Sequence, residues 1–118
     1  MKYMLLIYDN ADTRERFADD PALMGEMEAL MAELTESGEL LAGVGLADPV
    51  QTRSIRPRDG VPVVTDAPLA EAKEHFGGYL LLDCESLERA TEIALRWPNA
   101  RTGALELRPV MGEAGTEM

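Results

Sequence analysis

Apolar residues recur along this chain with two different periods. Alternation with a period of two predicts strands, and recurrence with a period near 3.6 predicts helices. Together the patterns outline a strand, a helix, a strand, a hairpin, a strand, a helix and a final strand. The strands are predicted over residues 2–8, 40–46, 51–57, 61–65, 78–83 and 104–110, and the helices over 20–37 and 86–97. A loose helical turn is expected over 12–19, and a turn with a short helix over 66–76.

Two of these strands have apolar residues on both faces. Residues 2–8 and 78–83 are apolar in nearly every position, whereas 104–110 alternates apolar and charged residues. Strands that are buried on both faces occupy the centre of a sheet, and alternating strands have one face toward solvent. Because the order of elements is that of a split βαβ unit, we predict an α+β fold with a ferredoxin-like sheet and an extra β-hairpin.

Both predicted helices would cover the same face of this sheet. The opposite face would then expose Leu, Met and Tyr side chains, which a soluble monomer rarely leaves open. A second copy, packed sheet to sheet around a twofold axis, would cover them. The sequence therefore predicts a homodimer.

Capping and turn residues mark the ends of several elements. Asp20 followed by Pro21 is a typical helix start. Ser86 is the predicted N-cap of the second helix. Asp59-Gly60 lies between two alternating runs and predicts the tight turn of the hairpin.

Length and charge narrow the classes of protein. The 118 residues suffice for one domain, which we place at 1–111, with a flexible tail at 112–118. The formal net charge of −11 disfavours nucleic-acid and membrane partners. No apolar run is long enough to span a bilayer, and we expect the first residues to form a strand rather than a signal peptide. Cys84 is the single cysteine, so an intrachain disulfide is excluded, and we expect a cytoplasmic protein.

Carboxylates between residues 66 and 74 are the candidates for acid–base chemistry. Asp66 either caps a turn by accepting a backbone N–H, which we favour, or serves as a general base at the mouth of a cleft. Glu71 and Glu74 lie three residues apart on one helical turn and could be coupled, although a solvated charged turn is the simpler interpretation. Lys73, on the same turn, is a candidate for substrate binding.

His75 and Cys84 flank the strand predicted over 78–83. They should therefore lie at its opposite ends, which disfavours a nucleophile pair. The sequence also lacks the spacing of a zinc site, a P-loop, a dinucleotide-binding turn or a hydrolase elbow. We therefore predict no metal and no cofactor.

Arginine and tyrosine side chains supply the other candidates for substrate binding. Arg53 and Arg56 stand out in an acidic chain, and one of them could bind a carboxylate or phenolate in a cleft. Local pairing with Asp48 or Asp59 is the alternative. Tyr8 and Tyr79 could donate their hydroxyls to a ligand, or their rings could fill an interface.

The stretch from Val64 to Tyr79 holds a turn, a short charged helix and a Gly-Gly break, and it resembles the signature of the DGPF domain, a branch of the YCII-related proteins. The resemblance extends over nearly the whole chain, through Met4–Tyr8, Ser37–Leu40, Gly45-Leu46, Arg56–Gly60 and Leu107–Val110. It implies a dimeric α+β barrel with a cleft between the sheet and the loops. It implies no particular reaction, because the family is largely uncharacterised.

The chain departs from the family pattern at several positions. Ala67 and Leu69 stand where the DGPF signature has Gly and Phe. If that Gly adopts a positive φ, Ala67 costs on the order of 1 kcal/mol. Some YCII-like proteins use a His on the first helix, shortly after a Pro-Ala pair, together with an Asp as an acid–base pair. Here Leu23 follows Pro21-Ala22, so this His is missing.

These residues predict a protein that binds a small hydroxyaromatic or carboxylic molecule in a sheet-side cleft. The cleft would be lined by Tyr8, Tyr79 and Leu69, with one arginine holding an anionic oxygen. Acid–base chemistry at Asp66 or Glu74 would make the protein an enzyme. The alternative is a non-enzymatic dimeric interaction module accessory to a transcription regulator, a role that the family resemblance implies.

Overall fold

The computed structural model describes residues 1–69 and 74–113. It combines helices and strands in the predicted order. The elements are β1 (Lys2–Asp9), α1 (Ala11–Asp19), α2 (Pro21–Ser37), β2 (Leu40–Gly45), the 3₁₀ helix η1 (Pro49–Gln51), β3 (Ser54–Arg58), β4 (Val61–Thr65), β5 (His75–Asp83), α3 (Leu87–Arg96), α4 (Asn99–Thr102) and β6 (Ala104–Pro109).

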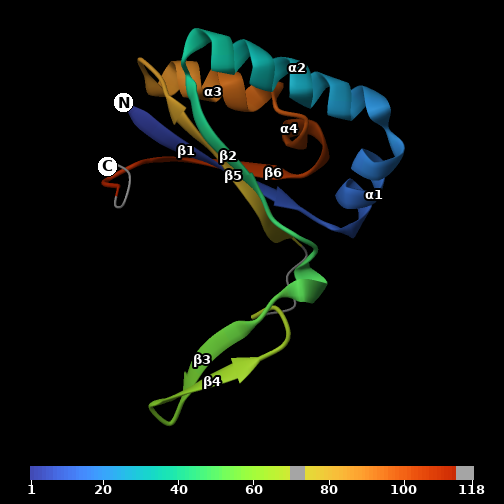
Figure 1. Cartoon of the computed structure of the whole chain (residues 1–118), viewed down its shortest axis with the longest axis vertical. Helices are drawn as coiled ribbons and strands as arrows, with labels where there is room; N and C mark the ends of the chain where they lie inside the picture. Colours follow the sequence, from blue (N-terminus) through green and yellow to red (C-terminus); the bar gives the residue numbers. More distant parts are fainter. Residues whose placement is uncertain (70–73, 114–118) are drawn as a thin grey trace.

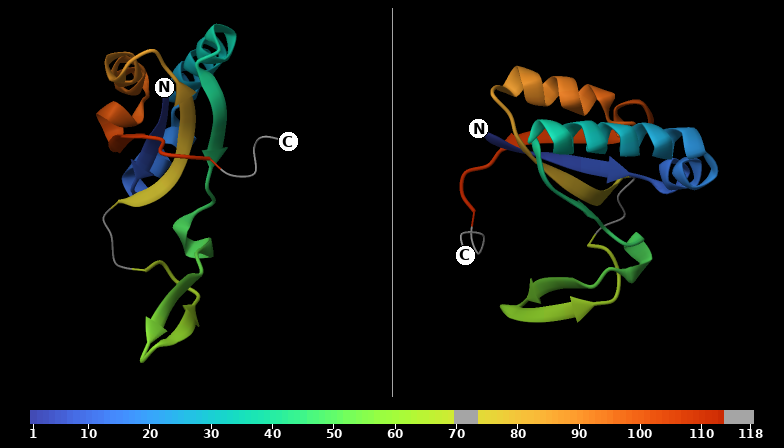
Figure 2. Two further views of the ribbon diagram at one scale, coloured as in Figure 1. Left: turned by 90° about the vertical axis from the view of Figure 1, so that its left-hand side faces the viewer. Right: turned by 45° about the horizontal axis from the view of Figure 1, so that its top comes forward.

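Four strands form an antiparallel sheet in the order β2-β5-β1-β6. The two strands that are apolar on both faces, β1 and β5, occupy its centre, as predicted. The helices cover one face of this sheet, and the other face carries none of the described helices (Figures 1 and 2). The predicted α+β fold, with a ferredoxin-like sheet and an extra hairpin, is confirmed.

The core lies between the sheet and the helices because alternate residues of the central strands point there. Tyr3 and Leu5 of β1 and Leu80 and Leu82 of β5 are almost fully buried. They pack with residues of α2 and α3, namely Leu30, Leu34, Ala90 and Ile93. The other parity, including Met4, Leu6 and Leu81, is half-buried on the open face.

Helices α2 and α3 begin at the capping residues that the sequence predicted. The Asp20 side chain accepts a hydrogen bond from the Ala22 N–H at 2.9 Å, and the Ser86 hydroxyl accepts one from the Arg89 N–H at 3.1 Å. Each bond satisfies a backbone donor that the helix cannot pair. The predicted N-caps of α2 and α3 are therefore confirmed.

The hairpin β3–β4 extends away from the sheet as an arm (Figure 1). Its two-residue turn has positive φ at both Asp59 (53°) and Gly60 (78°), the geometry that suits the twist of a hairpin. Ile55 and Val61 on the arm are 64% and 61% exposed. The radius of gyration is 16.2 Å, whereas a compact chain of this length has one of roughly 13–14 Å.

Several boundaries differ from the predicted ones. Residues 11–19 form a complete helix, α1, because Asn10 accepts from the Thr13 N–H and caps it. A further helix that was not predicted, α4, follows Pro98. The first hairpin strand begins at Ser54 rather than at residue 51, because residues 49–51 form η1, which Asp48 caps.

The signature segment also differs in detail. His75 and Phe76 already belong to β5, so no helix reaches them, and residues 70–73 of the expected short helix lie outside the described residues. Within the described ranges Asp59 is the only non-glycine residue with a positive φ, so Ala67 carries no such strain.

Part of the predicted tail at 112–118 is described. Lys2 and Glu113 form an ion pair with Nζ and Oε1 2.6 Å apart, and residues 114–118 lie outside the description. No described helix is long and apolar enough to cross a membrane.

Candidate functional site

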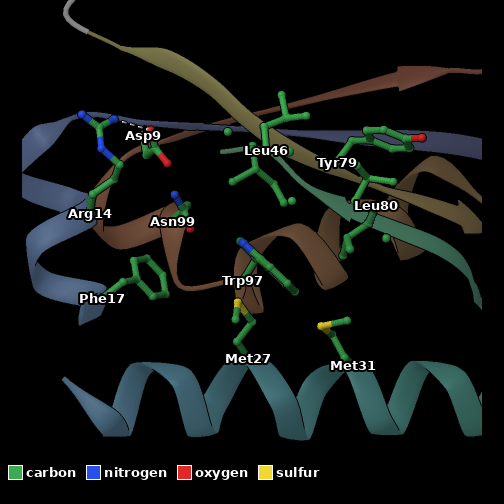
Figure 3. A pocket seen from close by; sticks show the side chains of 16 residues that line it. Asp9, Arg14, Phe17, Met27, Met31, Leu46, Tyr79, Leu80, Trp97 and Asn99 are labelled. Carbon is green, nitrogen blue, oxygen red and sulfur yellow. Dashed lines mark hydrogen bonds and ion pairs between the residues drawn. The ribbon is translucent and has the colours of Figure 1, made fainter. Parts of the chain in front are cut away.

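A cavity of about 440 Å³ lies on the helical side of the sheet, where β1 ends and β5 begins. Its walls are mainly apolar and come from the sheet and from α1 and α2 (Figure 3). The main apolar side chains are Phe17, Met27, Met31, Leu46 and Leu80. A concave space with apolar walls and a few polar groups is the usual form of a small-molecule site.

The Gly-Gly pair of the signature segment shapes the sheet wall of this cavity. The pairing of β1 with β5 has a bulge here, because Ile7 lies opposite Gly78 whereas Tyr8 lies opposite Phe76. A Cβ on Gly78 would lie 2.3 Å from the carbonyl oxygen of Val44, and one on Gly77 would lie 2.6 Å from Oδ2 of Asp9. Position 78 therefore requires glycine, which lets β2 approach β5, whereas at position 77 a side chain would displace the Asp9 carboxylate.

An ion pair borders the cavity at the end of β1. Arg14 of α1 donates from Nη1 to Oδ1 of Asp9 at 3.0 Å, and its Nε lies 3.8 Å from Oδ2 of Asp48. The Asp9 and Arg14 side chains are 22% and 30% exposed, so the pair is partly screened by solvent. Asp9 is the acidic residue of the cavity lining, and Arg14 is its basic residue.

Two buried polar side chains lie deeper in the cavity. Asn99 donates from Nδ2 to the carbonyl oxygen of Tyr8 at 3.1 Å, which anchors its amide to β1. Trp97 is 4% exposed, and its indole Nε1 is buried without a hydrogen-bond partner among the described residues. The edge of the Trp97 ring that carries this nitrogen is directed toward the side of Asn99 (Figure 3), and neighbouring atoms cover the nitrogen itself.

The residues predicted for the site are distributed over four places. Tyr79 lines the cavity, although Figure 3 shows its hydroxyl directed away from Trp97. Tyr8 is one of the β1 residues that point to the open face of the sheet. Its ring contacts Phe76 edge-on, with centroids 5.7 Å apart. The neighbouring Glu106 carboxylate raises the pKa of the Tyr8 phenol above its ordinary value.

The other predicted residues lie on the arm or at its base. Arg53 donates from Nε to Oδ1 of Asp66 at 3.0 Å, and the two side chains are 71% and 81% exposed. Arg53 thus pairs with Asp66, and Asp48 contacts Arg14 instead. Arg53 and Glu74 border a hollow of about 650 Å³ at the base of the arm.

Arg56 lines a separate hollow on the arm, and Lys73 and Glu71 lie outside the described residues. His75 begins β5 and Cys84 directly follows it, so the two side chains lie at opposite ends of this strand, as expected. Cys84 is buried, and burial raises the pKa of its thiol. The described residues hold no group of three or more His, Cys, Asp or Glu suited to a metal ion.

Asp9, Arg14, Trp97 and Asn99 were not among the predicted site residues. Trp97 ends the helix predicted over 86–97, and the apolar pattern of that helix does not reveal an unpaired donor. Asp9 directly follows the strand predicted over 2–8 and is the last residue of β1, and this position was the available signal. Polar residues at the ends of buried strands often lie at the edge of a site.

Comparisons with known proteins identify the family and the fold. The sequence profile of the YCII-related domain matches residues 1–113. An uncharacterized protein of Rhizobium meliloti strain 1021 is 31% identical over 114 residues, which cover 93% of this chain and 92% of the relative.

One solved structure is similar over 93% of both chains, with a TM-score of 0.50 and 15% sequence identity. It is 5-chloro-2-hydroxyhydroquinone dehydrochlorinase (TftG) from Burkholderia phenoliruptrix, in complex with 2,5-dihydroxybenzoquinone. At this identity the likeness concerns the fold.

Proposed function

The chain belongs to the YCII-related domain family, and we propose that it binds a small hydroxyaromatic or carboxylic molecule in the cavity between the sheet and helices α1 and α2. The observation that carries this proposal is the cavity itself. Its volume of about 440 Å³ lies in the lower part of the range of ligand sites, which suits a single substituted ring. Its thioether and aromatic walls favour contact with a planar ring.

The ligand class also has support from the structural neighbour. TftG was solved with a hydroxylated quinone, which is a single ring with oxygen substituents. A molecule of this kind would match the present cavity, in which apolar walls surround a few polar groups. The likeness to TftG extends to the fold, and the ligand is our proposal for this chain.

The chemistry that the cavity could support depends on Asp9. Its carboxylate accepts a hydrogen bond from Nη1 of Arg14. A charged carboxylate beside a bound ring can accept a hydrogen bond or a proton from a ligand hydroxyl. Asp66 and Glu74 are the acid–base candidates of the sequence, and they lie instead on the arm and at its base.

A thermal-shift screen tests where the ligand binds. Candidate ligands are catechol, hydroquinone, 4-hydroxybenzoate and 2,5-dihydroxybenzoquinone. A ligand at 100 times its Kd should stabilise the protein by roughly 2.7 kcal/mol. Met27→Trp should obstruct the cavity and abolish this shift, whereas Met24→Trp on the same helix, where the side chain is exposed and outside the cavity lining, should preserve it.

A further variant separates the cavity from the hollow at the base of the arm. Arg53→Gln removes the arginine of that hollow and of the pair with Asp66. Unchanged ligand binding in this variant, together with loss in Met27→Trp, assigns the ligand to the cavity. Loss of binding in Arg53→Gln alone would assign the ligand to the arm and contradict the proposal.

The proposal includes a homodimer formed through the open sheet face. Half-buried apolar side chains, among them Met4, Leu6 and Leu81, share this face, and exposed Val44 adjoins them on β2. Soluble monomers rarely leave a contiguous apolar patch of this kind open. A second copy related by a twofold axis would place identical apolar strips against each other.

A second candidate function rests on the arm. Ile55, Val61 and Val64 are exposed on the hairpin, and such side chains are typical of a surface that another protein covers. This supports the alternative of a non-enzymatic interaction module accessory to a transcription regulator. A protein that binds no ring compound, and whose Ile55→Lys variant loses a purified regulator partner, would favour this function over the first.

A further inference from the structure

We propose that Trp97 donates its indole N–H to an uncharged oxygen of the ligand, so that the deep end of the cavity selects a ring bearing a carbonyl or hydroxyl group over one bearing a carboxylate. This inference rests on the proposed binding of a small molecule in the same cavity. It narrows the proposed ligand from hydroxyaromatic or carboxylic molecules to hydroxyaromatic ones. It also assigns the direction in which the ring enters the cavity.

The first argument is the unpaired donor. Buried polar atoms in folded proteins nearly always have a hydrogen-bond partner, because an unpaired donor loses its bond to water and gains nothing in return. Nε1 of Trp97 is buried without a partner, whereas the neighbouring Asn99 amide donates to Tyr8. A phenylalanine would serve the core without this cost. An oxygen of a bound ligand supplies the partner that the described residues do not.

The second argument is that the indole is held in place, because Trp97 is only 4% exposed and its backbone is fixed at the end of α3. Trp97 is the C-cap residue of α3, and its own N–H donates to the carbonyl oxygen of Ala94 at 3.1 Å. Pro98 follows directly and is fully buried. The ring therefore has little freedom to find another acceptor, and a partner has to come to it. Met27, which lies beside it in Figure 3, is flexible enough to yield to an entering ring.

The third argument is the distribution of charge around the cavity. Arg14 is the one cation of the described lining, and it is engaged by Asp9 and Asp48 near the end of β1. Trp97 and Asn99 offer dipoles and no full positive charge. A carboxylate beside them would lose its hydration without gaining a counter-ion, whereas a neutral oxygen needs only one donor. The deep end is therefore suited to a carbonyl or a hydroxyl.

The outer end of the ligand then lies near Asp9. A carboxylate accepts hydrogen bonds and cannot donate them, so it favours a hydroxyl on the ligand. The preferred molecule thus has a ring with an oxygen acceptor at one end and a hydroxyl donor at the other. Its ring would lie among Phe17, Met27 and Met31, where contacts between sulfur and aromatic rings are favourable.

Three ring compounds of similar size separate these requirements. They are 4-hydroxyacetophenone, which has a neutral carbonyl, 4-hydroxybenzoate, which has a carboxylate, and 4-ethylphenol, which lacks the second oxygen. Calorimetry on the full chain should give a Kd for 4-hydroxyacetophenone about tenfold lower than for the other two. Trp97→Phe keeps an aromatic ring and removes the N–H. It should raise the Kd for 4-hydroxyacetophenone about tenfold and leave that for 4-ethylphenol within about twofold.

A second measurement does not depend on the variant. Trp97 is the only tryptophan of the chain, so the ¹⁵N-labelled protein has a single indole N–H resonance. A hydrogen bond to the ketone should move this proton downfield, and 4-ethylphenol should not. The proposal is supported if the ketone alone produces the downfield shift and the tenfold preference.

Other outcomes overturn the inference and remain distinguishable from one another. Equal preference for the ketone in wild type and Trp97→Phe, or no downfield shift, removes the role of Trp97 and leaves the proposed function intact. Tighter binding of 4-hydroxybenzoate overturns the selection for a neutral oxygen. If none of the three compounds, nor any compound of the thermal-shift screen, binds the wild-type protein, the proposed function fails and the inference fails with it.

Discussion

Gly78→Ala is expected to be one of the most destabilising single-methyl changes in this chain. Its added carbon would lie 2.3 Å from the Val44 carbonyl oxygen, and real Cβ contacts are essentially never below 3.0 Å. The two strands would therefore have to separate by at least about 0.7 Å. The φ of Gly78, +156°, is in addition one that alanine rarely adopts.

The separation would act on hydrogen bonds at this end of the sheet. Leu46 donates its N–H to the carbonyl oxygen of Gly77 at 2.9 Å, directly beside the added methyl group. Weakening this bond and straining the backbone together should cost roughly 2–4 kcal/mol. Ligand affinity should fall as well, because Gly77 and Gly78 form a wall of the cavity.

Gly45→Ala is the matched control. Gly45 lies opposite Gly78 in the pairing of β2 with β5, yet a Cβ there meets nothing within 4 Å. Urea denaturation should give unfolding free energies for this variant within about 1 kcal/mol of wild type. If the two variants are equally stable, the close approach of β2 to β5 does not require glycine at position 78, and the prediction is wrong.

Three further predictions concern other parts of the molecule. Leu6→Asp on the open face should convert a particle of twice the chain mass into a monomer in light scattering; an unchanged mass would refute the dimer proposal. Arg89 holds the pKa of Glu39 at about 2, below its ordinary 4.5, so the pair stabilises the fold above pH 4.5 and this contribution is lost as the pH falls toward 2. Glu39→Gln should therefore flatten the acid limb of the stability profile between these values, and an unchanged limb would contradict it. Asp66→Asn breaks a pair that is exposed on both sides and should change the unfolding free energy by less than about 1 kcal/mol in thermal denaturation; a larger loss would mean that the turn depends on this carboxylate.

The arrangement of the sheet could be predicted because its signals are repeated in many residues. Both central strands are apolar on each face, and this pattern alone places them between two neighbours. Helix α1 was underestimated because Phe17 is its one large apolar residue, so it shows no hydrophobic stripe. Its position depends instead on the Asn10 cap and the contact of Arg14 with Asp9.

The position of the cavity could not be predicted from titratable residues. The charged residues of the signature segment led us to predict Asp66 and Glu74 as site residues. The glycines of the same segment are the residues that shape the cavity wall. Trp97 and Asn99 come from the end of α3 and from α4, far along the chain. Their meeting with Asp9 depends on how α4 packs against β1, which no local pattern specifies.

The arm also has a consequence for the order in which the chain folds. It is inserted between β2 and β5, which are neighbours in the sheet, so pairing Gly45 with Gly78 closes a loop of about thirty residues. A hairpin with a two-residue turn involves only local contacts and can form within microseconds, before distant strands meet. Once formed, it brings Ser54 and Thr65 side by side and shortens the flexible part of that loop. The arm thus lowers the entropic cost of joining the two halves of the sheet, whatever it contacts in the finished protein.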